Sequence, residues 1–102
     1  MYIILWQFDV IPGCEAEFES LYGPGGDWVQ LFRQFDGFIG TELLHDVHHR
    51  GRYLTLDRWR AAPDYEAFLE GRGEKYQEID RRGEKLTRHE TRIGAFEENR
   101  AR

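Results

Sequence analysis

The stretch that decides the fold is Arg52-Tyr53-Leu54-Thr55-Leu56-Asp57-Arg58-Trp59. It predicts a β-strand because branched, aromatic and apolar residues dominate it, and it ends shortly before Pro63, which suits the first turn of a helix. Side chains alternate between the two faces of a strand. One face therefore carries Tyr53, Thr55, Asp57 and Trp59, and the other carries Leu54 and Leu56 between Arg52 and Arg58. A face that mixes aromatic and polar groups is typical of a small-molecule pocket.

The composition predicts one folded unit. The chain has 102 residues, 40% of them hydrophobic and 32% charged, which is enough for a single domain over residues 1–102. A formal net charge of −5 argues against a nucleic-acid-binding protein. Without a basic leader, or an apolar run near the roughly 18 residues of a membrane span, we expect a cytoplasmic protein that does not enter membranes. The single cysteine, Cys14, cannot form an internal disulfide.

The first half of the chain predicts a strand followed by a divided helical segment. Residues 2–10 alternate as a strand does, with one face that carries Tyr2, Ile4, Trp6, Phe8 and Val10. Apolar residues then recur at helical spacing up to Phe35, and Gly23-Pro24-Gly25-Gly26 divides this segment in two. Asp27 is placed to cap the second piece.

The second half predicts a hairpin, a long helical segment and a last strand. Residues 38–47 form the second predicted strand, and residues 48–51 connect it to the strand at 52–59. Helical periodicity continues from 63 to 86, where Gly71 and Gly73 would loosen or kink the helix. Residues 91–96 predict a short final strand, and residues 97–102 a frayed tail.

The order βαββαβ predicts an α+β fold of the ferredoxin-like type, in which a four-stranded antiparallel sheet carries its helices on one face. The opposite face would be apolar as well, since it holds Ile3, Leu5, Leu54 and Leu56. An exposed patch of that size is unusual in a monomer. We therefore expect a homodimer whose two sheets pack face to face, with the helices outside.

Three features of the chain resemble the antibiotic biosynthesis monooxygenase domain family, whose members form dimeric α+β barrels. They are Val10-Ile11-Pro12-Gly13-Cys14-Glu15 with Phe18, Asp36-Gly37-Phe38, and residues 53–59 followed by Tyr65 and Phe68. The resemblance covers nearly the whole chain. The family includes cofactor-free oxygenases of anthrones and quinols, haem-degrading enzymes, and members whose reaction is undefined.

The resemblance also implies site residues. Family oxygenases of polycyclic phenols place a Trp at the end of the third strand and a Tyr six residues later, which Trp59 and Tyr65 match. Where those enzymes have an Asn this chain has Thr55, and no residue matches their helical Arg. Haem-degrading relatives use an Asn where Trp6 stands and a His on the second helix. Because residues 63–86 contain no His, haem degradation is disfavoured.

Roles follow for each candidate residue. Asp57 is the expected proton acceptor, because an apolar setting raises a carboxyl pKa toward the range useful for a general base. Tyr65 would donate a hydrogen bond to the oxygen that gains charge, and Trp59 would hold the plane of the substrate ring. Trp6, Trp28 and Thr55 are expected to complete the walls of the substrate pocket.

Simpler interpretations stay open for all of these residues. The tryptophans and Tyr65 can be ordinary core residues, and Asp57 can pair with an arginine. Cys14, near a helix start but without an identifiable partner, is expected to be an inert thiol. Metal binding is disfavoured, because the last three of the four candidate ligands crowd a predicted turn and lack the helical spacing of strong zinc motifs. These candidate ligands are His45, Asp46, His48 and His49.

Two classes of function remain. The first is a small monooxygenase that needs no cofactor and oxidises an electron-rich phenol, quinol or anthrone with O2. The second is a non-catalytic dimeric protein that binds a small molecule on the same fold. The sequence contains no dinucleotide fingerprint and no P-loop, so an oxidation would have to draw its electrons from the substrate. We expect neither a cofactor nor a metal.

Overall fold

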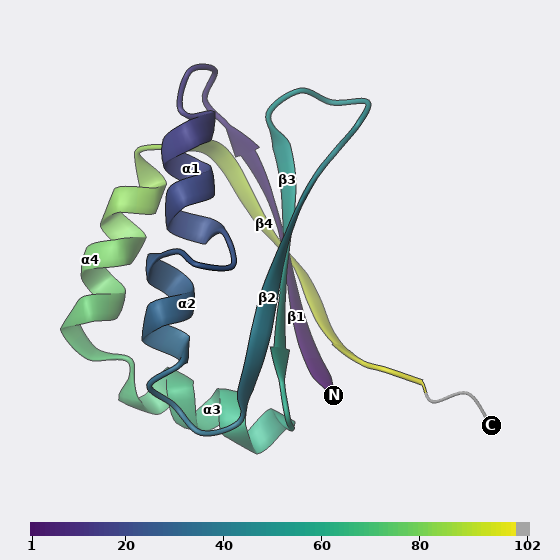
Figure 1. Cartoon of the computed structure of the whole chain (residues 1–102), viewed down its shortest axis with the longest axis vertical. Helices are drawn as coiled ribbons and strands as arrows, with labels where there is room; N and C mark the ends of the chain where they lie inside the picture. The colour runs from purple at the N-terminus through teal and green to yellow at the C-terminus, as the bar shows by residue number, and fades with distance from the viewer. Residues whose placement is uncertain (100–102) are drawn as a thin grey trace.

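The computed structural model describes residues 1–99. Within them, strands and helices follow one another in the order βααββααβ (Figure 1). The elements are β1 (Tyr2–Val10), α1 (Glu15–Tyr22), α2 (Asp27–Phe32), β2 (Phe38–His45), β3 (Arg52–Trp59), α3 (Ala62–Gly71), α4 (Gly73–Glu84) and β4 (Thr87–Glu97). No helix in this part of the chain is both long enough and apolar enough to cross a bilayer.

The four strands form one antiparallel sheet in the order β2-β3-β1-β4. The helices cover one face of it, and the other face carries no layer of its own (Figure 1). This confirms the predicted ferredoxin-like α+β fold, with each predicted helical segment divided into two helices.

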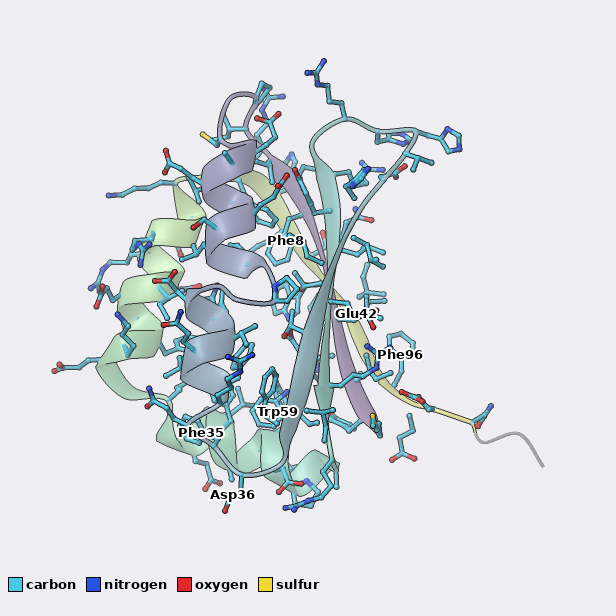
Figure 2. All side chains as sticks on the ribbon, viewed as in Figure 1. Phe8, Phe35, Asp36, Glu42, Trp59 and Phe96 are labelled. Atoms are coloured by element: carbon cyan, nitrogen blue, oxygen red, sulfur yellow. The ribbon has the colours of Figure 1, made fainter. Side chains whose placement is uncertain are left out.

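The alternation of side chains along the two central strands decides which face is covered. Ile4, Phe8 and Val10 of β1 are buried against the helices, as are Tyr53 and Trp59 of β3. Figure 2 shows Phe8 and Trp59 between the sheet and the helices, whereas Glu42 and Phe96 lie on the open side. The face assignments predicted for both strands are confirmed by this burial pattern.

The glycine-rich break between α1 and α2 is required by a close backbone approach. A Cβ on Gly26 would lie 2.5 Å from the carbonyl oxygen of Leu21, so only glycine fits there. Gly26 is also the residue that precedes α2, so the prediction that Asp27 caps this helix from outside was wrong. Asp27 is the first residue of α2, and its carboxylate pairs with Arg82 of α4 at 2.8 Å. Phe35 lies beyond the end of α2.

The predicted kink in the second helical segment is a complete break. Only Arg72 separates α3 from α4, and Gly73 begins α4 with a φ of +61°, a conformation that glycine adopts readily. As a result α3 crosses the end of the sheet while α4 runs along it (Figure 1).

The last strand, β4, is longer than predicted, and its pairing with β1 shifts at two places. It spans 87–97 rather than 91–96, and β2 ends at His45 rather than at Val47. One shift in the pairing of β4 with β1 falls between Leu5 and Trp6, so that Gly94 lies opposite Leu5 but Arg92 lies opposite Trp6. Of the predicted tail, Glu97 belongs to β4, Glu98 and Asn99 follow it, and residues 100–102 lie outside the described residues.

Candidate active site

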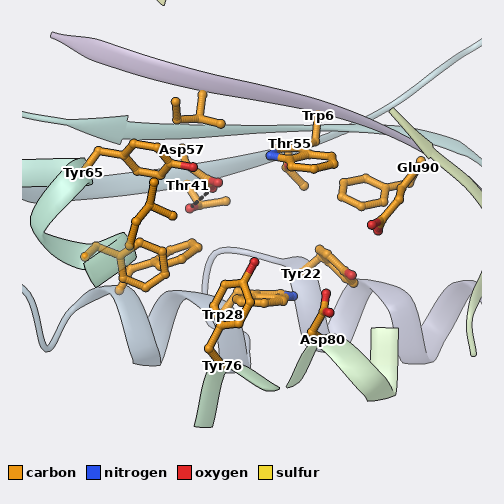
Figure 3. A pocket seen from close by; sticks show the side chains of 15 residues that line it. Trp6, Tyr22, Trp28, Thr41, Thr55, Asp57, Tyr65, Tyr76, Asp80 and Glu90 are labelled. Atoms are coloured by element: carbon orange, nitrogen blue, oxygen red, sulfur yellow. Dashed lines mark hydrogen bonds between the residues drawn. The ribbon is translucent and has the colours of Figure 1, made fainter. Parts of the chain in front are cut away.

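A cavity lies between the sheet and the helices, and all four strands and all four helices contribute to its lining (Figure 3). Counted as the space open to the centre of a water molecule, its volume is about 110 Å³. One water needs roughly 10–15 Å³ by this measure. The cavity therefore has room for a ligand and not only for an isolated water.

One end of the cavity holds a carboxyl group with an unusual pKa. Asp57 of β3 lies directly across from Thr41 of β2, whose hydroxyl donates a 2.7 Å hydrogen bond to its Oδ1. Burial raises the pKa of Asp57 to about 6, although the hydrogen bond from Thr41 opposes this rise. A carboxyl group with this pKa can exchange a proton near neutral pH.

Tyr65 of α3 lies at the same end of the cavity (Figure 3). Burial raises the pKa of its phenol, so Tyr65 stays protonated at neutral pH and can donate a hydrogen bond. The guanidinium of Arg92 on β4 opposes this rise in pKa, because a positive charge favours the phenolate. The end near Asp57 thus combines a proton acceptor with a hydrogen-bond donor.

Aromatic rings form the walls of the cavity. Trp6 of β1 lies on the sheet side, and Trp28 of α2 and Tyr76 of α4 lie on the helix side (Figure 3). The Trp28 and Tyr76 rings meet edge to face, with centroids 5.1 Å apart. Such walls suit a flat aromatic ligand.

The other end of the cavity is acidic. Asp80 of α4 and Glu90 of β4 both line it, and their side chains lie on the same side of Trp28, away from Asp57 (Figure 3). The pKa of Glu90 is raised, first by burial and then by the negative charges of Asp80 and Glu84. Tyr22 lies beside this pair, and burial raises the pKa of its phenol as well.

Five of the six residues singled out from the sequence line this cavity: Trp6, Trp28, Thr55, Asp57 and Tyr65. Trp59 does not line it. Its side chain is fully buried, at 0% exposure, behind Tyr65 and Phe68, with ring centroids 5.8 and 5.5 Å away. Trp59 was expected to hold the plane of the substrate ring, but its own ring is enclosed by Phe32, Phe38 and Phe68 and belongs to the core beneath the site.

Sequence reasoning missed several polar groups that line the cavity: Tyr22, Thr41, Tyr76, Asp80 and Glu90. Thr41 could have been found from the hairpin, because the register of β2 and β3 places it opposite Asp57. Tyr76 and Asp80 are spaced i, i+4 on one helix and share a face. Glu90 could not have been found from the sequence, since the sheet face on which it lies depends on the pairing shift in β4.

The histidine-rich hairpin connection lies away from this cavity. Asp46 accepts hydrogen bonds from the backbone N–H groups of His48 and His49, at 2.8 and 3.2 Å, and so stabilises the turn. These bonds hold the pKa of the Asp46 carboxyl below its usual range. Within residues 1–99, no group of three or more His, Cys, Asp or Glu side chains is arranged to hold a metal ion.

Solved structures share this architecture at low sequence identity. One similar structure is that of a point variant of SnoaB, a cofactor-independent oxygenase from Streptomyces nogalater. It matches with a TM-score of 0.76 at 18% identity, over 98% of this chain and 94% of that one. A candidate antibiotic biosynthesis monooxygenase from Deinococcus radiodurans matches with a TM-score of 0.75 at 17% identity, over 99% of this chain and 95% of that one. A conserved protein from Methanosarcina mazei matches with a TM-score of 0.71 at 16% identity, over 96% and 92%. At these identities the matches establish the fold alone.

Sequence comparison supplies the family. No curated protein matches the chain significantly. The family model described as antibiotic biosynthesis monooxygenase matches residues 1–79, which include β1 to β3 and the first residues of α4. Since this match covers well over half of the 102 residues, the chain belongs to the antibiotic biosynthesis monooxygenase family.

Proposed function

We propose that the protein is a cofactor-independent monooxygenase that oxidises an electron-rich phenolic, quinol or anthrone-type aromatic compound with O2. The observation that carries this proposal is Asp57, a carboxyl group with a pKa of about 6 at one end of a cavity with aromatic walls. Membership of the family supports the reaction class. The likeness to the oxygenase SnoaB supports the absence of a cofactor.

Proton removal from the substrate is the step that Asp57 would perform. Ground-state O2 is a triplet, so its direct reaction with a closed-shell phenol is slow, whereas a phenolate can pass one electron to O2 and then recombine with the resulting superoxide. Asp57 would accept the proton of the substrate. Tyr65, a protonated phenol at the same end of the cavity, would donate a hydrogen bond to the oxygen that gains charge.

The oxidation balances without an external reductant. For an anthrone, the radical pair recombines to a hydroperoxide at the ring CH2 carbon, and loss of water then leaves a ketone. One oxygen atom enters the product, the other leaves as water, and the substrate supplies all four electrons. The remaining task of the protein is to ionise the substrate, orient it and exclude water.

Trp59 would act as a positioning residue in this scheme. It packs against Tyr65 and Phe68 from behind, so it fixes the wall that Tyr65 presents to the cavity. Trp6, Trp28 and Thr55, which line the cavity directly, would contact the substrate.

We propose further that the protein works as a homodimer assembled through the open face of the sheet. Ile3, Leu5, Leu54 and Leu56 are only partly buried on this face, although they belong to the two central strands. Ile39 and Phe96 are 51% and 47% exposed. A second copy would cover these side chains, as expected from the sequence.

The proposed reaction is tested by oxygen uptake. Purified protein, treated with a chelator, is supplied with a panel of naphthols, hydroquinones and anthrones in an oxygen electrode, and the product is analysed by mass spectrometry with ¹⁸O2. Incorporation of one labelled oxygen atom supports the proposal. Saturable binding with no oxygen uptake across the panel favours the alternative, a non-catalytic binding protein.

A further inference from the structure

The acidic end of the cavity carries two carboxyl groups that form no ion pair with a cation among residues 1–99. Asp80 and Glu90 belong to different elements, α4 and β4, and interact closely enough for Asp80 to raise the pKa of Glu90. Neither forms an ion pair with any other residue among 1–99. Within residues 1–99, the lining of the cavity contains no Lys, Arg or His. Two like charges facing a partly closed space repel each other.

Two arginines lie close to residues of the lining without belonging to it. The guanidinium of Arg72 stacks on the ring of Tyr76, 4.8 Å from its centroid. Arg92 acts on Tyr65, at the end of the cavity near Asp57. Glu84 adds further negative charge near Glu90. The acidic end therefore keeps its negative charge, and Arg72 shows that this aromatic wall already attracts a cation.

The rings around the acidic end are those that recognise cations in other proteins. In Figure 3 Asp80 lies between Trp28 and Tyr22, and Tyr76 lies next to Trp28. The faces of Trp and Tyr rings attract ammonium groups. The indole of Trp28 also carries a buried hydrogen-bond donor. This N–H group lies close enough to the Tyr22 hydroxyl to favour the phenolate form of Tyr22. Within residues 1–99, however, the Trp28 Nε1 meets no acceptor in hydrogen-bond geometry. A hydrogen-bond acceptor on the ligand, separate from any ammonium group, can meet this donor.

We propose that the substrate is an aromatic compound with a protonated amine, held between Asp80 and Glu90 while its oxidisable ring faces Asp57 and Tyr65. This inference rests on the proposed function, because it takes the cavity to be the substrate site. The amine supplies the missing positive charge, and the aromatic walls hold the rings. A carboxylate at the same position of the substrate is repelled.

The test compares three matched ligands under nitrogen, where no oxidation can occur. They are naphthols that carry an aminomethyl, a hydroxymethyl or a carboxylate group on the ring remote from the phenol. Binding is measured by calorimetry near neutral pH. We expect the amine to bind at least about tenfold more tightly than the alcohol, and the carboxylate to bind most weakly.

The acidic pair is tested by substitution. In the Asp80→Asn, Glu90→Gln double variant the preference for the amine over the alcohol should disappear. It should persist in Glu66→Gln, which removes an exposed carboxylate of α3 that does not line the cavity. Asp80→Asn alone serves if the double variant does not fold, and should at least halve the preference.

Equal affinity for amine and alcohol, or an unchanged preference in the double variant, would overturn the inference, as would failure of all three ligands to bind. Because the readout is binding without O2, it is separate from turnover. If the protein prefers the amine but consumes no oxygen, the proposed reaction is refuted, whereas the proposed class of ligand is supported.

Discussion

The hydroxyl of Thr41 donates a 2.7 Å hydrogen bond to the carboxylate of Asp57 across neighbouring strands, at the point where the sheet faces the cavity. The bond holds one oxygen of the carboxyl group and favours its ionised form, whereas burial favours the protonated form. Burial is the larger effect, so the pKa of Asp57 settles at about 6. The protein thereby keeps a base that is ionised at neutral pH and still basic enough to take a proton.

The first prediction concerns the pH dependence of activity. If Asp57 is the base, kcat/KM should rise with pH and level off above about 6, the pKa of this group in the free enzyme. Thr41→Val removes the hydrogen bond that favours the carboxylate, so the inflection should move to higher pH. Oxygen uptake measured across the pH range checks both points. An inflection that stays in place in the variant would contradict the assignment of Asp57.

The second prediction concerns stability. The folded-state pKa of Asp57 is raised above its ordinary value of 3.8, so its contribution to the free energy of unfolding is full below pH 4 and is lost as pH rises through about 6. Asp57→Asn removes this dependence and still offers an oxygen to Thr41. Above pH 7 the variant should be more stable than the wild type by roughly 1–3 kcal/mol, since one pKa unit corresponds to 1.36 kcal/mol.

Thermal unfolding of both proteins at pH 4, 6 and 8 measures this difference. The two melting temperatures should diverge as pH rises. A constant difference at all three pH values would show that Asp57 has an ordinary pKa in the folded protein.

The third prediction separates Tyr65 from Tyr2, a neighbouring tyrosine that does not line the cavity. Tyr65→Phe removes only the hydroxyl, so it should lower kcat by roughly 10- to 1000-fold if this group donates to the developing charge, with little change in stability. Tyr2→Phe is the matched control, because Tyr2 packs against Tyr65 with ring centroids 6.0 Å apart but does not line the cavity. Steady-state kinetics decide the matter, and equal activity of the two variants would remove Tyr65 from the mechanism.

The fourth prediction concerns assembly. Leu54→Glu places a carboxylate in the face that we propose to be the dimer contact, so it should dissociate the dimer or prevent its folding. Ala67→Glu makes the same kind of change at an exposed position of α3 and should leave the dimer intact. Sedimentation equilibrium at micromolar concentration should give twice the chain mass for the wild type and for Ala67→Glu. A monomeric wild type would contradict the proposal.

Much of the fold could be predicted because local signals agreed with one another. The two-residue period of side chains along residues 2–10 and 52–59 separated the two sheet faces, and Gly23-Pro24-Gly25-Gly26 together with Gly71 and Gly73 marked the breaks that the structure contains. The same alternation placed Thr55 and Asp57 on the covered face. Helix ends were less certain, as Asp27 illustrates, because a helix start depends on backbone geometry that residue type alone does not specify.

The acidic end of the cavity could not be predicted, because it depends on an irregularity in one strand. Simple alternation would place Glu90, Arg92 and Phe96 on the same face of β4. The pairing shift instead sets Glu90 opposite Phe8 and Arg92 opposite Trp6, on the covered side, while Phe96 lies opposite Ile3 on the open side. Pairing shifts of this kind have no reliable signature in a single sequence.

Trp59 was expected to contact the substrate, but it does not line the cavity, for a different reason. Its place in the strand was predicted correctly, but the depth of a side chain depends on what packs over it. Tyr65 and Phe68 of α3 cover the indole ring, so it lies one layer behind the cavity wall. Only the path of α3 decides this, and the sequence did not specify it.

The clearest measurement of whether Asp57 is the base compares the oxygen consumption of Asp57→Asn with that of the wild type, on an anthrone that the wild type oxidises. The variant keeps the shape of the side chain but cannot accept the proton. Oxygen uptake should fall by roughly 10²- to 10⁴-fold in a protein whose circular dichroism spectrum is unchanged. Uptake at the wild-type rate by the folded variant would contradict the account.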